Sequence, residues 1–117
     1  MQAIYIRQGQ VVAWLSGKEI YDHSGHFIGF LIDNAFYNRS SKYCGTLKQS
    51  FFRDIGGRVV AFLKGAKNGP ALPSLKSLPS RPVKKSRPSS IVVPPPPVTK
   101  PMKNSWSKLE WEAFIGA

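Results

Sequence analysis

The side chains best able to do chemistry in this sequence are histidine, aspartate and serine, and few of them lie together. The two histidines, His23 and His26, stand beside Asp22 in a short polar segment. Three such groups could hold a metal ion, but a zinc site normally needs more ligands with supporting contacts, and the sequence suggests none. Solvated turn residues are the better interpretation, so we expect no metal and no cofactor.

The patterns that mark common enzymes are also missing. No serine stands in a Gly-x-Ser-x-Gly elbow, and there is neither a phosphate-binding loop nor a dinucleotide fingerprint. Of the six Asp and Glu residues, Asp22 and Asp54 occupy equivalent places in an internal repeat, which favours turn capping over catalysis. We therefore expect a binding protein and not an enzyme.

The elements that must position these side chains come from four copies of a 16-residue repeat over residues 4–63. Eleven residues before each repeat leucine stands Ile or Phe, and two residues before it stands only Ala or Gly. The next column after the Ile/Phe column is mostly tyrosine. The leucines that define the interval are Leu15, Leu31, Leu47 and Leu63.

Each copy is typical of a β-hairpin. In the second copy, Asp22 and Gly25 have the spacing of a type I turn between β-branched and aromatic segments. The small-residue column suggests a place where backbones crowd together. Four hairpins with unsatisfied edges would most simply close into a ring. The repeat thus predicts an all-β fold, a pseudo-fourfold closed or nearly closed meander of eight strands in residues 1–66.

The second copy, residues 17–31 (GKEIYDHSGHFIGFL), resembles the repeat of the bacterial four-fold β-flower domain. The resemblance covers about residues 3–66 and implies the fold but no catalytic residues. The third copy departs from the pattern with Ser41 at the turn and Thr46 in an aromatic column. The fourth has Arg53 in the tyrosine column. These changes either adjust packing or make one hairpin the functional one.

The tyrosine column is the candidate ligand site. If its members ring one face, three aromatic rings and a guanidinium would line a shallow cup able to stack a base or hold an anionic or planar ligand. The alternative is that the tyrosines complete a small core and keep their hydroxyls wet. The candidate residues are Tyr5, Tyr21, Tyr37 and Arg53.

The composition changes sharply after residue 66. All ten prolines lie in the region from Pro70 to Pro101, and this region is rich in Ser, Lys and Arg. We expect residues 67–104 to be a disordered basic linker, stiffened by the polyproline run at 94–97. Nucleic-acid binding is the alternative function, through the basic cluster of Lys84, Lys85 and Arg87 together with Arg and Lys side chains near the turns.

Residues 105–117 form an apolar terminal peptide with a helix-start pattern, in which Ser107 and Glu110 have capping-box spacing. Such a peptide either docks on a protein partner or covers its own β-domain. The docking candidates are Trp106, Leu109, Trp111, Phe114 and Ile115.

The primary prediction is therefore a non-enzymatic adaptor, in which the β-domain is a ligand or assembly surface and the terminal peptide binds a protein partner. Homo-oligomers are possible. Cys44 is the single cysteine, so no intrachain disulfide can form. No run of 18 apolar residues occurs, so we expect no membrane span and a cytoplasmic location.

Overall fold

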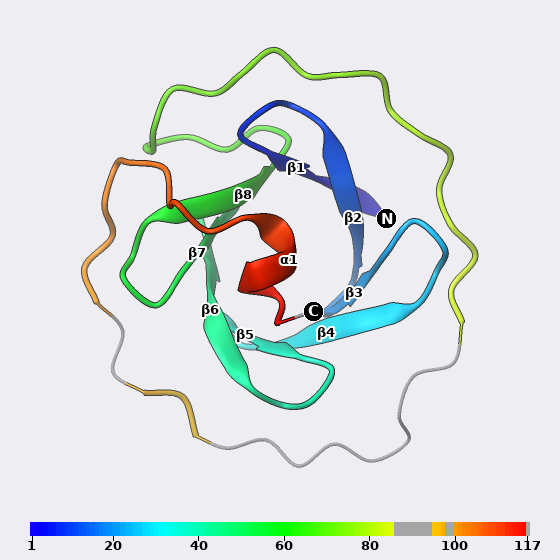
Figure 1. The fold of residues 1–117 in the computed structure, drawn as a ribbon, viewed down its shortest axis with the longest axis horizontal. Helices are drawn as coiled ribbons and strands as arrows, with labels where there is room; N and C mark the ends of the chain where they lie inside the picture. The colour runs from blue at the N-terminus through cyan, green and yellow to red at the C-terminus, as the bar shows by residue number, and fades with distance from the viewer. Residues whose placement is uncertain (86–94, 98–99, 117) are drawn as a thin grey trace.

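The chain folds into a closed antiparallel barrel in which each strand pairs with the next (Figure 1). The computed structural model describes residues 1–85, 95–97 and 100–116. Ile4 of the first strand pairs with Leu63 of the last, which closes the sheet and confirms the predicted all-β closed meander. The strands are β1 (Gln2–Ile6), β2 (Val11–Ser16), β3 (Glu19–Tyr21), β4 (Phe27–Ile32), β5 (Ala35–Asn38), β6 (Tyr43–Lys48), β7 (Phe51–Arg53) and β8 (Val59–Leu63).

The four hairpins share one register. In each of them the pairing shifts by one residue directly after the Ile/Phe column, as between Ile4 and Tyr5 in the first hairpin. Such a bulge bends the strand and increases its twist. Four equivalent bulges thus give each hairpin the same bend, and together these bends help the sheet to close.

The hairpin turns confirm the capping role of the repeated Asp/Asn position. Asp22 accepts hydrogen bonds from the backbone N–H groups of Ser24 and His26 through Oδ1. Asn38 and Asp54 accept equivalent bonds from residues in their own turns. These carboxylates and amides are therefore occupied in holding the turns.

The barrel interior holds the inward-facing columns of the repeat. Because strand residues alternate between faces, the Ile/Phe column points inward and the tyrosine column that follows it points outward. Trp111 and Phe114 of the terminal peptide join this interior. The fully or largely buried members are Ile4, Ala13, Leu15, Ile20, Ile28, Leu31, Phe36, Cys44, Phe52, Val60, Ala61, Leu63, Trp111 and Phe114.

Residues 67–104, called the strap below, run round the outside of the barrel in their described parts (Figure 1). The backbone N–H groups of Lys76, Lys85 and Lys103 donate to the carbonyls of three turn glycines, Gly9, Gly25 and Gly57, at 2.9, 2.9 and 3.0 Å. Nine strap residues separate the first two donors, and 16 barrel residues separate their acceptors.

Between the second and third contacts both intervals double, to 18 residues in the strap and 32 in the barrel. An interval of nine residues in the strap therefore corresponds to one hairpin repeat. The described strap therefore follows a defined path on the barrel, which differs from the free linker that its composition predicts.

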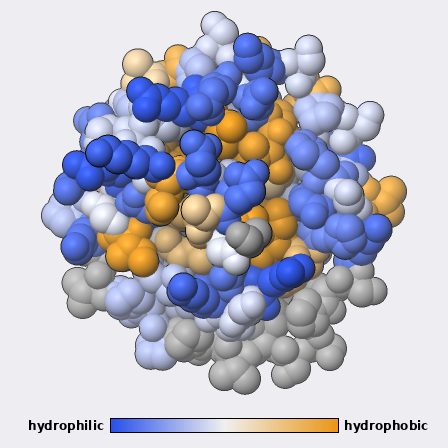
Figure 2. All heavy atoms as spheres, in the orientation of Figure 1, coloured by the Kyte–Doolittle hydropathy of each residue, from blue (hydrophilic) through white to orange (hydrophobic). Residues whose placement is uncertain are grey.

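A short helix, α1 (Trp111–Phe114), closes the end of the barrel that carries the glycine turns (Figure 1). Figure 2 shows hydrophobic atoms in the centre of this face, ringed by hydrophilic residues. Phe114 stacks on Phe36 at 5.4 Å between ring centroids, and Trp111 meets Phe52 edge-on at 5.9 Å. The terminal peptide thus docks in cis and extends the core of its own barrel.

Candidate functional site

The tyrosine column does not form a cup. Tyr5, Tyr21, Tyr37 and Arg53 are 5%, 3%, 0% and 1% exposed, and they lie on the outer wall of the barrel at four separate places. Cross-strand aromatic partners cover the three tyrosines, as Phe62 covers Tyr5 at 5.5 Å between ring centroids, whereas Thr46 faces Arg53. The predicted open cup is therefore wrong, because a column on the outside of a closed barrel diverges instead of converging.

The strap adds to this cover. Lys84 places its ammonium 5.9 Å above the ring of Tyr21 and 3.3 Å from the hydroxyl of Ser16. Arg53 donates from Nη1 to the carbonyls of Gly57 and Lys103, at 2.9 and 2.6 Å. The fourth member of the column therefore links the barrel to the strap.

The terminal peptide divides into buried and exposed parts. Trp111 and Phe114 are each 4% exposed, whereas Leu109 is 46% exposed. Trp106 is half-buried and meets Phe62 edge-on in the outer layer, and Ile115 is half-buried beside the interior. The structure therefore packs four of the five candidate docking residues against their own barrel, in agreement with the alternative in which the peptide docks in cis.

The predicted capping box is wrong. α1 begins at Trp111 with Glu110 as its N-cap, and no side chain caps it. Ser107 lies further back, where its N–H donates to the carbonyl of Val59 in an extended bridge beside β8. Its hydroxyl donates to Asp54 and accepts the N–H of Leu109 at 3.1 Å, so it bonds two residues before α1 and does not cap the helix.

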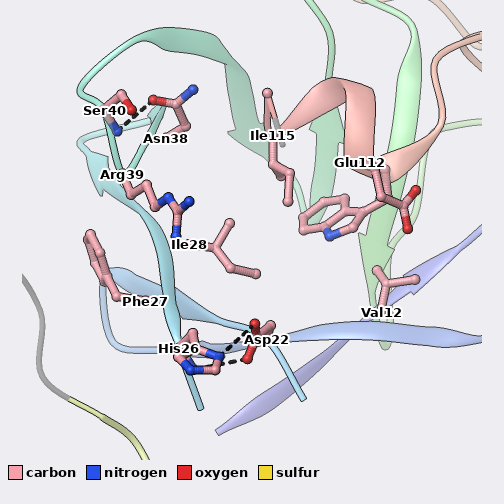
Figure 3. A pocket seen from close by; sticks show the side chains of 12 residues that line it. Val12, Asp22, His26, Phe27, Ile28, Asn38, Arg39, Ser40, Glu112 and Ile115 are labelled. Carbon is pink, nitrogen blue, oxygen red and sulfur yellow. Dashed lines mark hydrogen bonds and ion pairs between the residues drawn. The ribbon is translucent and has the colours of Figure 1, made fainter. Parts of the chain in front are cut away.

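A cleft of about 330 Å³ separates α1 from the second and third hairpin turns (Figure 3). Ile28, Ile115 and Val12 give it apolar walls. The hydrogen-bonded pair of His26 Nδ1 and Asp22 Oδ2, 3.3 Å apart, lies at one side of it. Asn38, Arg39, Ser40 and Glu112 supply the remaining polar groups. These groups can hold a small polar molecule.

The opposite end of the barrel is basic. Lys48 ends β6, the turns that follow β2 and β8 carry Lys18 and Lys64, and the strap brings further lysines to the same end. Lys84 bonds to Ser16 at the end of β2, and Lys100 shares a small cavity with Lys48. We call this set the basic end: Lys18, Lys48, Lys64, Lys67, Lys84 and Lys100.

The carboxylates favour the other end. Four of the six acidic residues, Asp22, Asp54, Glu110 and Glu112, lie in the glycine turns or beside α1. Only Asp33 and Glu19 stand near the turns of the basic end. The one ion pair between described residues joins His26 to Asp22, so no described lysine forms an ion pair with a described carboxylate.

The predicted nucleic-acid cluster is only partly described. The side chain of Lys84 turns toward the basic end. Lys85 is exposed and bonds to Gly25 through its backbone. Arg87 lies outside the described residues, as does Pro94 at the start of the polyproline run.

The described residues contain neither a membrane-spanning helix nor a metal-binding cluster. No helix among them is long and apolar enough to cross a membrane. No three or more of their His, Cys, Asp and Glu side chains come together as a possible metal site. The Cys44 thiol is buried, and this burial raises its pKa, which disfavours the reactive thiolate.

Two sequence signals were missed. Pro70, Pro79, Pro88 and Pro97 recur at the nine-residue interval that the strap uses. The departures Thr46 and Arg53, noted separately, prove to be cross-strand partners. The proline interval could have been found as a second internal repeat. The pairing of Thr46 with Arg53 could have been found by aligning the repeat columns across neighbouring predicted strands.

Comparison with known proteins agrees with the repeat. The family model described as 4-fold beta flower protein matches residues 2–115, which confirms the resemblance. The match includes the strap and the terminal peptide as well as the barrel. Neither the curated proteins nor the solved structures contain a significant match to the chain.

Proposed function

The chain belongs to the 4-fold beta flower family, and we propose that on this fold it works as a non-enzymatic nucleic-acid-binding protein that uses its basic end. The observation that carries the proposal is the gathering of six lysines at one end of the barrel, where few carboxylates lie. A phosphate backbone is a regular row of anions, and lysines bind it without reading sequence.

The geometry of the basic end supports a rigid binding surface. Its lysines come from the strands and turns of a closed barrel and from a strap hydrogen-bonded to that barrel, so the backbone that carries them is held in place. Five of the six are exposed and Lys48 is half-buried. The net charge of +11 also favours fast association with a polyanion.

The adaptor function, in which the terminal peptide holds a protein partner, has less support. Trp111 and Phe114 would have to leave the barrel interior before a partner could contact them. Burying two aromatic side chains stabilises a small domain by several kcal/mol, so their release is unfavourable.

Since a free buried thiol suits a reducing compartment, we place the protein in the cytoplasm.

Neutralising part of the basic end tests the proposal. In the triple variant Lys18→Gln, Lys64→Gln, Lys67→Gln, we expect affinity for a labelled single-stranded oligonucleotide to fall on the order of 10²-fold at 0.1 M salt. The slope of log K against log salt should become shallower by about 2, since each lost phosphate contact contributes about 0.7. Fluorescence anisotropy over a range of salt concentrations measures both quantities.

The matched control removes the same charge from the opposite end. Arg39→Gln, Lys42→Gln, Lys108→Gln changes three exposed cations near α1 and lowers net charge equally. It should bind within about 5-fold of the unmodified protein, through the weaker long-range term. Equal losses in the two variants would show that only net charge matters, and the basic end would then not be the site.

A further inference from the structure

On the outer wall of the barrel, the repeat creates four equivalent junctions between neighbouring strands, of which three are aromatic and one is polar. At three junctions a tyrosine of one strand faces an aromatic residue of the next: Tyr5 faces Phe62, Tyr21 faces Trp14, and Tyr37 faces Phe30. At the junction of β6 and β7, Thr46 faces Arg53. The two departures from the repeat therefore occur together, on facing positions of neighbouring strands.

The polar character extends along the whole outward face of β6. Its outward positions carry Tyr43, Thr46 and Lys48, whereas the equivalent positions of β4 carry Phe27, Phe30 and Ile32. Thr46 is only 7% exposed, so its hydroxyl is withdrawn from bulk water. A buried polar group of this kind needs a hydrogen-bond partner.

Arg53 is a buried cation that forms no ion pair with another described residue. It is 1% exposed, and its Nη1 donates to two backbone carbonyls. Its Nε has no hydrogen-bond acceptor among the described residues. Burial lowers the pKa of the guanidinium from its usual value, because the low-dielectric surroundings disfavour the charged form. An unpaired buried charge is costly, so a counter-charge at this place would stabilise the fold.

The neighbouring carboxylate is already occupied. Asp54 follows Arg53 in the chain, but its Oδ1 accepts the N–H of Arg58 and its Oδ2 accepts the hydroxyl of Ser107. It therefore holds the fourth turn and the terminal peptide in place.

A small, partly open cavity lies among these groups. Its volume is about 20 Å³, enough for one particle of about the size of a water molecule. Arg53, Lys48 and Lys100 bring three cations to it, and the burial of Tyr43 and the nearby Tyr37 raise the pKa of the Tyr43 hydroxyl, which thus stays a donor. The lining residues are Tyr43, Thr46, Lys48, Arg53, Asp54, Ile55, Gly57, Lys100 and Met102.

We propose that this cavity between β6, β7 and the strap binds one small monovalent anion with the size and charge of chloride. The Arg53 guanidinium, the Thr46 and Tyr43 hydroxyls and the two lysine ammonium groups can all donate. The Asp54 carboxylate also lines the cavity, but both of its oxygens already accept hydrogen bonds. Three cations against one carboxylate suit an anion better than a neutral molecule. Because Lys100 and Met102 belong to the strap, a bound anion would also fasten the strap to the barrel at the hairpin where the repeat is least regular.

The test compares sodium chloride with sodium gluconate at equal ionic strength, in the full chain without nucleic acid. Gluconate is too large for the cavity, so both salts screen surface charge but only chloride can bind. Once chloride exceeds its dissociation constant several-fold, we expect the melting temperature in chloride to exceed that in gluconate by about 4 °C or more.

Repeat-equivalent lysines supply the control. Lys48 and Lys64 lie 16 residues apart at the same place in successive repeats, but only Lys48 lines the cavity. Lys48→Gln should remove at least half of the chloride-specific shift, and Lys64→Gln should leave it unchanged. No difference between the two salts, or an equal effect of both substitutions, would overturn the proposal and leave the cavity to water. The nucleic-acid test leaves Lys48 and Lys100 intact, so the two proposals can fail separately.

Discussion

Trp111→Ala should lower the free energy of unfolding by about 3–5 kcal/mol, the usual cost of removing a buried tryptophan side chain. Trp111 is 4% exposed and packs against Phe52 and Phe114 at 5.9 and 5.7 Å between ring centroids. A fold of this size has a total stability of about 5–15 kcal/mol, so the loss is a large share of it. Urea denaturation followed by circular dichroism measures the change.

Leu109→Ala is the matched control, because Leu109 lies two residues away in the same peptide but is 46% exposed. Its effect should stay within about 0.5 kcal/mol. If Trp111→Ala were as mild as Leu109→Ala, the peptide would not be part of the core. The adaptor function, with the peptide free to hold a protein partner, would then be better supported than nucleic-acid binding.

The repeat made most of the barrel predictable. Residues such as Leu15 and Ile4 recur at a fixed interval with a fixed face, so hairpins, register and closure follow from local rules. The small column could also be interpreted, since a Cβ added to Gly29 would lie 2.3 Å from the carbonyl oxygen of Tyr37 on the neighbouring strand. Backbone crowding therefore explains the glycines of this column.

The path of the strap was harder to predict from sequence. Its contacts to the turns are backbone hydrogen bonds, and its larger apolar side chains, such as Leu78 and Val83 at 58% and 84% exposure, stay in water. The composition of the strap therefore resembles that of a free linker, since no pattern of hydrophobic residues marks where the strap contacts the turns. The predicted tyrosine cup was wrong for a related reason. The burial of these residues on the outer wall depends on the strap and on their cross-strand partners, which composition does not reveal.

The register of the strap on the barrel can be tested at one glycine. Gly25→Ala places a Cβ 1.8 Å from the carbonyl oxygen of Val83, so the strap has to move away from this turn. Losing its hydrogen bond to Lys85 should make local opening about 5- to 10-fold more frequent, in keeping with about 1 kcal/mol for such a bond. Trypsin cleavage after Lys84 and Lys85, followed by mass spectrometry, should accelerate by the same factor.

Gly17→Ala separates this effect from backbone strain. Gly17 also has a positive φ, 60° against 84° for Gly25, but a Cβ there meets nothing within 4 Å. Both substitutions carry the cost of a left-handed alanine, roughly 1–2 kcal/mol, and only one displaces the strap. Faster cleavage in Gly25→Ala alone would show that the turn glycines are needed for the close approach of the strap. Equal cleavage in both would mean that the strap is not fastened there, and that the nine-residue spacing has another cause.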